Sequence, residues 1–77
     1  MAPSRLEISD HAQDRIKQRG ITRQQVRNCL NLGKITGIDL RGRKICQKRI
    51  GSRLLIVVYI EVVGGQLVVT ACWKGEV

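Results

Sequence analysis

The chain has 77 residues, with 14 Lys or Arg against 6 Asp or Glu, and its formal net charge is +8. A chain of this length can bury only one core, which excludes a second domain. We therefore expect a single domain over residues 1–77, with a loose N-terminus over 1–7. The positive charge attracts polyanions, so a nucleic acid is the first expected partner and an acidic protein the second. The alternative is a solvated basic surface that binds nothing specific.

The cysteines and the apolar segments predict a cytoplasmic protein. The three cysteines are widely spaced and form no CxxC pair, so they imply no disulfide framework. The N-terminus lacks the apolar core of a signal peptide. The longest apolar run, residues 54–60, is too short to span a bilayer and is followed by Glu61. We therefore expect no membrane association, and the oligomeric state stays open.

The first helix is predicted over about 10–19. Ser9 or Asp10 can serve as its N-cap, because a short polar side chain accepts hydrogen bonds from the unpaired amides of the first turn. Gly20 can end the helix, since glycine adopts the left-handed conformation without a Cβ penalty.

A second helix is predicted to follow at once and to end near Leu32. Thr22 and Gln25 have the spacing of a capping box, in which each side chain bonds to the backbone of the other residue. Ile21 and Val26 flank this box with the spacing of a hydrophobic staple. This combination is a strong local indication of a helix start.

The pattern after Gly33 changes from helical to extended, because β-branched residues dominate and glycines punctuate the chain. We expect strands near 35–40, 43–50, 53–62 and 67–74. Gly51-Ser52 and Gly64-Gly65 suit two-residue hairpin turns, which favour residues that accept positive φ. The predicted fold class is α+β, with two N-terminal helices packed on one face of a four-stranded antiparallel sheet.

Pairing through these turns assigns side chains to the two faces of the sheet. One face carries Ile56, Val58 and Ile60 and is expected to receive the helices, whereas Tyr59 lies on the other face with Lys44 and Lys48. This scheme has a weakness, because it places Arg43, Gln47 and Arg49 beneath the helices, where unpaired charge is costly. A bulge or a one-residue slip in strand 43–50 would reverse its faces, so its register stays open.

His11, Arg15 and Arg19 form a stripe along the first predicted helix. With about 100° per residue, the two arginines lie about 40° and about 80° from His11, at the border of the buried face. In one interpretation the arginine stems cover the core, their heads bond to strand carbonyls, and His11 assists the helix cap. In the other, the stripe is a catalytic site.

RNA cleavage without a metal requires a base for the 2′-hydroxyl proton, an acid for the leaving 5′-oxygen, and cations for the phosphate. His11 can serve as base or acid, and Arg15 and Arg19 can clamp the phosphate through their planar donors. Tyr59 or a lysine of the sheet would then donate the second proton. We expect no metal and no cofactor, since the carboxylates are dispersed and no close Cys or His pair could start a zinc site.

The segment 40–49 is the most basic part of the chain. The expected nucleic-acid-binding residues are Arg41, Arg43, Lys44 and Lys48, together with Lys74. Alternation along a strand separates Lys44 and Lys48 from the arginines, and contacts of this kind hold phosphates without reading sequence. The alternative is an edge strand that its lysines protect from aggregation.

A resemblance to a known family accompanies these motifs. The opening HAxxRxxxRGI is formed by His11, Ala12, Arg15, Arg19, Gly20 and Ile21, and a VVTxxW-like ending by Val68, Val69, Thr70 and Trp73. Together they resemble a family of small bacterial domains catalogued only as a domain of unknown function. That family is similar to the RelE and ParE toxins and to the metal-independent ribonuclease fold of barnase.

The resemblance implies a RelE-like domain and a metal-independent endoribonuclease of toxin–antitoxin type, which cleaves RNA by 2′-hydroxyl attack and pairs with an acidic antitoxin. In RelE-like toxins the working cations and a tyrosine lie largely on the sheet, so only the matching residues His11, Arg15 and Arg19 are carried over. Two alternatives stay open: a non-catalytic basic module that binds nucleic acid, and a ParE-like toxin that acts by binding a protein.

Overall fold

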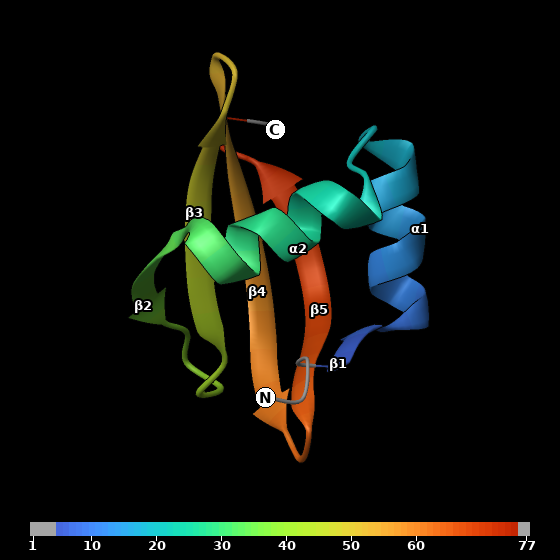
Figure 1. Ribbon diagram of the computed structural model, residues 1–77, viewed down its shortest axis with the longest axis vertical. Helices are drawn as coiled ribbons and strands as arrows, with labels where there is room; N and C mark the ends of the chain where they lie inside the picture. Colours follow the sequence, from blue (N-terminus) through green and yellow to red (C-terminus); the bar gives the residue numbers. More distant parts are fainter. Residues whose placement is uncertain (1–4, 76–77) are drawn as a thin grey trace.

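The computed structural model describes residues 5–75, which form two helices and a five-stranded sheet (Figure 1). The elements are β1 (Arg5–Ile8), α1 (Asp10–Gln18), α2 (Arg23–Leu32), β2 (Lys34–Ile38), β3 (Lys44–Ile50), β4 (Arg53–Val62) and β5 (Gly65–Trp73). The strand order is β1-β5-β4-β3-β2. Neighbouring strands are antiparallel except β1, which pairs parallel to β5. In this part of the chain no helix is long and apolar enough to cross a membrane.

The predicted α+β class is confirmed, but the four-stranded, wholly antiparallel sheet is wrong. The strand β1 adds a fifth member in parallel register, from Arg5 opposite Gly65 to Ile8 opposite Val68. It includes residues 5–7 of the segment expected to be loose, while residues 1–4 lie outside the described part. Leu6 and Ile8 alternate inward and are buried. A run of four residues is too short to reveal this alternation, and parallel pairing has no hairpin turn to announce it.

Both helices begin where the sequence predicts. The hydroxyl of Ser9 accepts a hydrogen bond from the Ala12 amide at 3.1 Å, so Ser9 is the N-cap of α1. Gly20, at φ 68°, follows the end of α1 in the left-handed conformation. The capping box of Thr22 and Gln25 is complete at the start of α2.

The two hairpins differ in how well they match the predicted register. Gly51-Ser52 forms the expected turn, because Ile50 pairs with Arg53. The second turn lies one residue earlier than predicted, at Val63-Gly64, and Gly64 has φ 85°. A bulge then shifts the β4–β5 pairing between Val58 and Tyr59.

The face of β4 that packs against the helices is the opposite of the one expected. Leu55, Val57 and Tyr59 are buried in the core, whereas Ile56, Val58 and Ile60 are only half-buried. Both faces of β4 are apolar, so the strand itself does not decide between them. Its neighbour β3 does, because the actual arrangement buries Cys46 and keeps Gln47 and Arg49 out of the core, removing the weakness of the predicted scheme.

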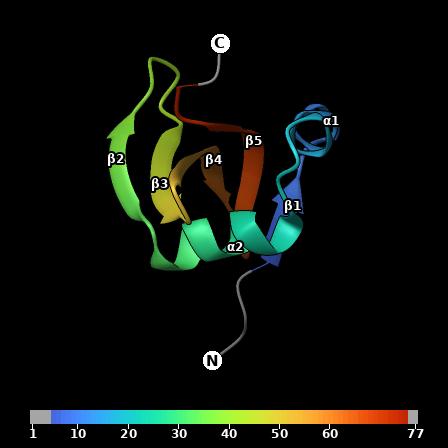
Figure 2. The ribbon, with the colours of Figure 1, turned by 90° about the horizontal axis from the view of Figure 1, so that it is seen from above.

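The helices cover the sheet unequally. Viewed from above, α2 crosses one face of β3 and β4, and α1 stands at the edge of the sheet beside β5 (Figure 2). No helix within residues 5–75 crosses the other face. We call this the uncovered face, and its half-buried residues include Ile45, Ile56, Val58, Ile60 and Cys72.

Candidate functional site

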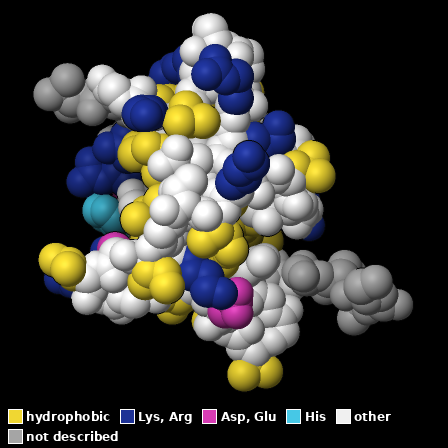
Figure 3. All heavy atoms as spheres, turned by 90° about the vertical axis from the view of Figure 1, so that its left-hand side faces the viewer, with side chains coloured by type: hydrophobic (Ala, Val, Ile, Leu, Met, Phe, Trp, Pro, Cys, Tyr) yellow, Lys and Arg dark blue, Asp and Glu magenta, His cyan; other side chains and the backbone are white. Residues whose placement is uncertain are grey.

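The structure brings His11 and Arg15 together in the first two turns of α1. Arg15 Nε donates a hydrogen bond to His11 Nε2 at 3.4 Å, and both side chains are exposed. The Ser9 cap fixes the start of the helix and so places the imidazole one turn from the guanidinium. Figure 3 shows the single histidine at the surface, close to dark-blue Lys and Arg groups. The pair is therefore open to solvent and to a polyanion.

Arg19 has a different position from the other two members of the stripe. Its Nη1 donates to the Ala71 carbonyl of β5 at 2.9 Å, and its own carbonyl accepts from Trp73 Nε1 at 3.0 Å. The strand β1 ends at Ile8, opposite Val68, and leaves the rest of the β5 edge without a neighbouring strand. Arg19 bonds to that edge and docks α1 against it, as the structural interpretation of the stripe predicts.

Tyr59 is a core residue on the α2 side of the sheet. Only 4 % of its surface is exposed, and it packs in the cluster that contains Leu55 and Val57. Burial raises the pKa of its phenol above the ordinary value, and the nearby Cys46 adds to this effect. The structure therefore places Tyr59 in the core and not in an exposed site with His11.

Two of the basic residues expected to bind nucleic acid form ion pairs instead. Arg43 Nε lies 2.6 Å from Asp39 Oδ2 in the loop between β2 and β3. Partial desolvation acts to raise the pKa of Asp39, but hydrogen bonds from Arg43 and Arg41 outweigh it and lower that pKa. Lys44 Nζ lies 2.5 Å from Glu61 Oε1, and this hydrogen bond raises the pKa of Lys44.

The five expected nucleic-acid-binding residues do not gather on one surface. Arg41 and Arg43 lie in or next to the β2–β3 loop, whereas Lys74 follows the end of β5. The predicted alternation of β3 is confirmed, because Lys44 and Lys48 share the side of Tyr59 and Leu55 while Arg49 points to the uncovered face. Since their charges act on separate regions, they support attraction of a polyanion more than one defined site.

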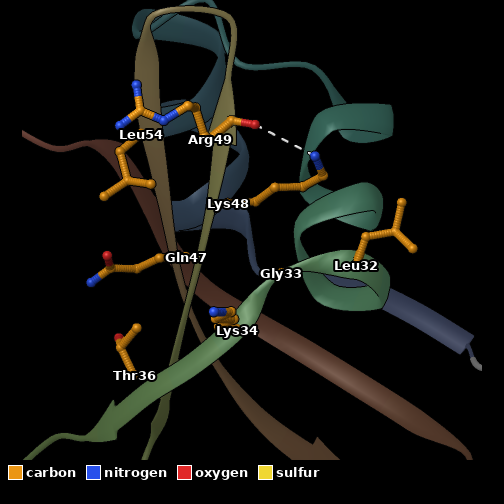
Figure 4. A pocket seen from close by; sticks show the side chains of 8 residues that line it. All are labelled: Leu32, Gly33, Lys34, Thr36, Gln47, Lys48, Arg49 and Leu54. Carbon is orange, nitrogen blue, oxygen red and sulfur yellow. Dashed lines mark hydrogen bonds between the residues drawn. The ribbon is translucent and has the colours of Figure 1, made fainter.

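A hollow that the sequence analysis missed lies where β2 leaves the end of α2 and the β3–β4 hairpin extends past it (Figure 4). This edge hollow has a volume of about 310 Å³ and is lined by Leu32, Gly33, Lys34, Thr36, Gln47, Lys48, Arg49 and Leu54. Of these lining residues, only Lys48 is among the predicted nucleic-acid-binding residues. The pairing of Lys34 with Gln47 brings these residues together, and that long-range register was not available from local patterns.

The three cysteines and the acidic residues form no metal site among residues 5–75. Cys29 and Cys46 are buried at the contact between α2 and β3, where each thiol donates to the other residue's carbonyl, at 3.6 Å and 2.9 Å. Burial, reinforced by Cys46, raises the pKa of Cys29 to about 12. These two thiols are protonated core groups and not nucleophiles.

This burial predicts a loss of stability in alkali. Cys29 ionises near its ordinary pKa of 9.0 in the unfolded chain but near 12 in the folded chain, so rising pH stabilises only the unfolded state. We expect the free energy of unfolding, measured by urea denaturation, to fall from about pH 8 to about pH 10 by at most about 1.4 kcal/mol per pH unit for this group. Cys29→Ala should make that decline shallower, and a decline of unchanged slope contradicts the assignment.

These features define a small, basic α+β domain with an exposed histidine–arginine pair on its first helix. Residues 8–73 match the family model described as a domain of unknown function (DUF4258), and the chain belongs to this family. No curated protein and no solved structure matches the chain.

Proposed function

We propose that the protein is a metal-independent endoribonuclease of toxin type. The observation that carries this proposal is the exposed pair of His11 and Arg15, in which an imidazole nitrogen accepts a hydrogen bond from a guanidinium. A ring nitrogen that accepts a hydrogen bond has the lone pair that a general base requires. The arginine beside it supplies a planar donor suited to a phosphate.

In the proposed reaction Arg15 turns from His11 Nε2 to the phosphate, and the released Nε2 lone pair accepts the proton of a ribose 2′-hydroxyl. The 2′-oxygen bonds to phosphorus as the bond from phosphorus to the 5′-oxygen breaks, which gives a 2′,3′-cyclic phosphate and a 5′-hydroxyl. Arg15 stabilises the additional negative charge on the phosphate oxygens. Because Tyr59 is buried in the core, water at this exposed site supplies the proton for the leaving 5′-oxygen. The hydroxide that forms takes the proton from His11 and so regenerates the base.

Arg19 has a positioning role in this proposal. Its bond to the Ala71 carbonyl holds the end of α1 against β5, and so fixes the helix that carries His11 and Arg15. The net charge of +8 attracts RNA to the domain. The HAxxRxxxRGI opening resembles the family of domains of unknown function, and the similarity that we propose between this family and the RelE and ParE toxins agrees with the same function.

The test is cleavage of RNA by the purified protein in the presence of EDTA. We expect fragments that end in a 2′,3′-cyclic phosphate, and we expect induced expression in bacteria to arrest growth. RNA that stays intact while still binding in a salt-sensitive way would instead indicate the non-catalytic nucleic-acid-binding module. Intact RNA together with harmless expression would contradict the proposal outright.

An acidic antitoxin is the proposed protein partner, and the uncovered face supports it. That face presents Ile56, Val58 and Ile60 without a covering helix, and Arg49 on the same side supplies positive charge. An amphipathic acidic segment could bury the apolar residues and pair with the charge. We expect the protein to co-purify from its native host with a small acidic protein, and recovery as a lone monomer would contradict this partnership. A growth arrest without RNA cleavage would favour the ParE-like alternative.

A further inference from the structure

We propose that the edge hollow binds a backbone phosphate of a single-stranded nucleic acid, as a subsite separate from His11 and Arg15. The proposal rests on the proposed function for the identity of the strand as RNA. The hollow has the size of a small ligand site, since about 310 Å³ lies at the lower end of the ~300–1,000 Å³ range of such pockets.

The charge of the lining favours an anion. Lys34 and Arg49 contribute cations on the Gln47 side of β3, Lys48 extends to the other side of that strand, and the lining contains no Asp or Glu. None of the three cations forms an ion pair with a carboxylate of residues 5–75, in contrast to Arg43 and Lys44 nearby. The only bond of the Lys48 ammonium among these residues is a long one, 3.4 Å, to the Arg49 carbonyl (Figure 4). The cations are therefore available to an incoming phosphate.

The backbone keeps the hollow open. The pairing of β2 with β3 begins at Lys34 opposite Gln47, so β2 does not cover β3 beyond Gln47. Gly33 turns the chain at this point, and a Cβ on it would lie 2.6 Å from the Gln47 carbonyl oxygen and 3.0 Å from Cys46 Sγ. The walls of the edge hollow are therefore formed by the backbone at Gly33 and by the part of β3 beyond Gln47 that β2 does not pair with.

The exposed surface of the lining is mostly apolar, with a few polar groups among it. Thr36 and Gln47 add polar side chains, while Leu32 and Leu54 flank them with apolar surface. The lining has no aromatic residue on which a base could stack. A phosphodiester chain carries one negative charge at each nucleotide, and the Lys34 and Arg49 cations on the Gln47 side of β3 match such a chain. Gln47, Arg49 and Leu54 place the hollow at one end of the uncovered face, so an acidic protein is the competing occupant that the test must distinguish.

The hollow lies across the sheet from α1. The helix packs against β5 and the hollow opens at β3, on the other side of β4, so a strand that contacts both must span the width of the sheet. In this arrangement the hollow holds the strand while His11 and Arg15 act on one linkage of it.

The test compares two substitutions that change the net charge equally. Gln47→Glu places a carboxylate in the hollow without changing the size of the side chain, and Gln24→Glu places one on the exposed N-terminal turn of α2. The probe is a fluorescent oligouridine with methylated 2′-hydroxyls, which can bind but cannot be cleaved. We expect Gln47→Glu to weaken binding about tenfold and Gln24→Glu to weaken it less than about twofold at physiological salt.

Equal weakening by the two substitutions, or no binding of the probe by the wild type, overturns the subsite. A polyglutamate peptide that binds the wild type in a Gln47→Glu-sensitive way, while the oligouridine does not, assigns the hollow to a protein and also overturns it. Free uridine monophosphate that competes as strongly as the oligonucleotide would point to a mononucleotide site instead of a strand. Cleavage is measured separately on unmodified RNA. If the protein does not cleave RNA, the proposed function fails, but the difference in oligouridine affinity between Gln47→Glu and Gln24→Glu still tests the subsite.

Discussion

Replacing His11 with alanine is expected to slow RNA cleavage by about 10²–10⁴-fold, the usual contribution of a positioned acid or base. The imidazole is the group that accepts the 2′-hydroxyl proton in the proposed reaction, and no second histidine exists in the chain. The side chain is exposed, so its removal leaves no cavity in the core. Initial rates in EDTA, followed with a short fluorescent RNA, measure the effect.

The matched control is Lys17→Ala, on the outward side of the same helix. Both variants should keep their free energy of unfolding within about 0.5 kcal/mol of the wild type, because neither side chain is buried. Lys17→Ala should retain nearly full activity, with a small loss of affinity at low salt. A His11→Ala protein that is folded and cleaves at the wild-type rate would remove the observation on which the proposed function stands.

Local patterns predicted the helices because the interactions that start them are local. The Ser9 cap joins residues three apart, and the capping box of Thr22 and Gln25 does the same. The contact between His11 and Arg15 was predictable for the same reason, since residues four apart lie side by side on any helix.

The sheet was less predictable than the helices, because it depends on contacts between residues that are distant in the sequence. The strand β1 pairs with residues 65–68, about sixty positions later in the chain. The covered face of β4 depends on which β3 side chains can be buried, and not on β4 alone. A one-residue difference in the second turn, together with the bulge at Val58 and Tyr59, was enough to change every partner of β5.

The same distinction applies to the candidate site. Arg19 bonds to the Ala71 carbonyl, 52 residues away, and nothing in the periodicity of the helix separates it from Arg15. The predicted pairing places Tyr59 on an open face, because it assigns the helices to the wrong face of β4. The edge hollow depends on the register that pairs Lys34 with Gln47. Sequence patterns therefore indicate which chemical groups are candidates, and the long-range pairing decides which of them are exposed.

Gly65→Ala is expected to lower the free energy of unfolding by about 3 kcal/mol, near the upper end of the range for forced overpacking. A Cβ at this position would overlap the Arg5 carbonyl oxygen and lie 2.7 Å from the Arg5 carbonyl carbon and nitrogen. These atoms belong to the backbone of β1, so no side-chain rotation can relieve the overlap. The strand must move away from β5, which exposes the buried Leu6 and Ile8. Urea denaturation measures the loss.

Gly37→Ala is the matched control, because a Cβ there meets no atom within 4 Å and the backbone lies outside the left-handed region. It should change the free energy of unfolding by less than about 0.5 kcal/mol. Hydrogen exchange distinguishes a local cause from a general one. In Gly65→Ala the amides of Arg5 and Ser9, which bond to Gly64 and Val68, should lose protection more than those of β3 and β4. Equal stability of the two variants would mean that β1 does not hold this parallel register.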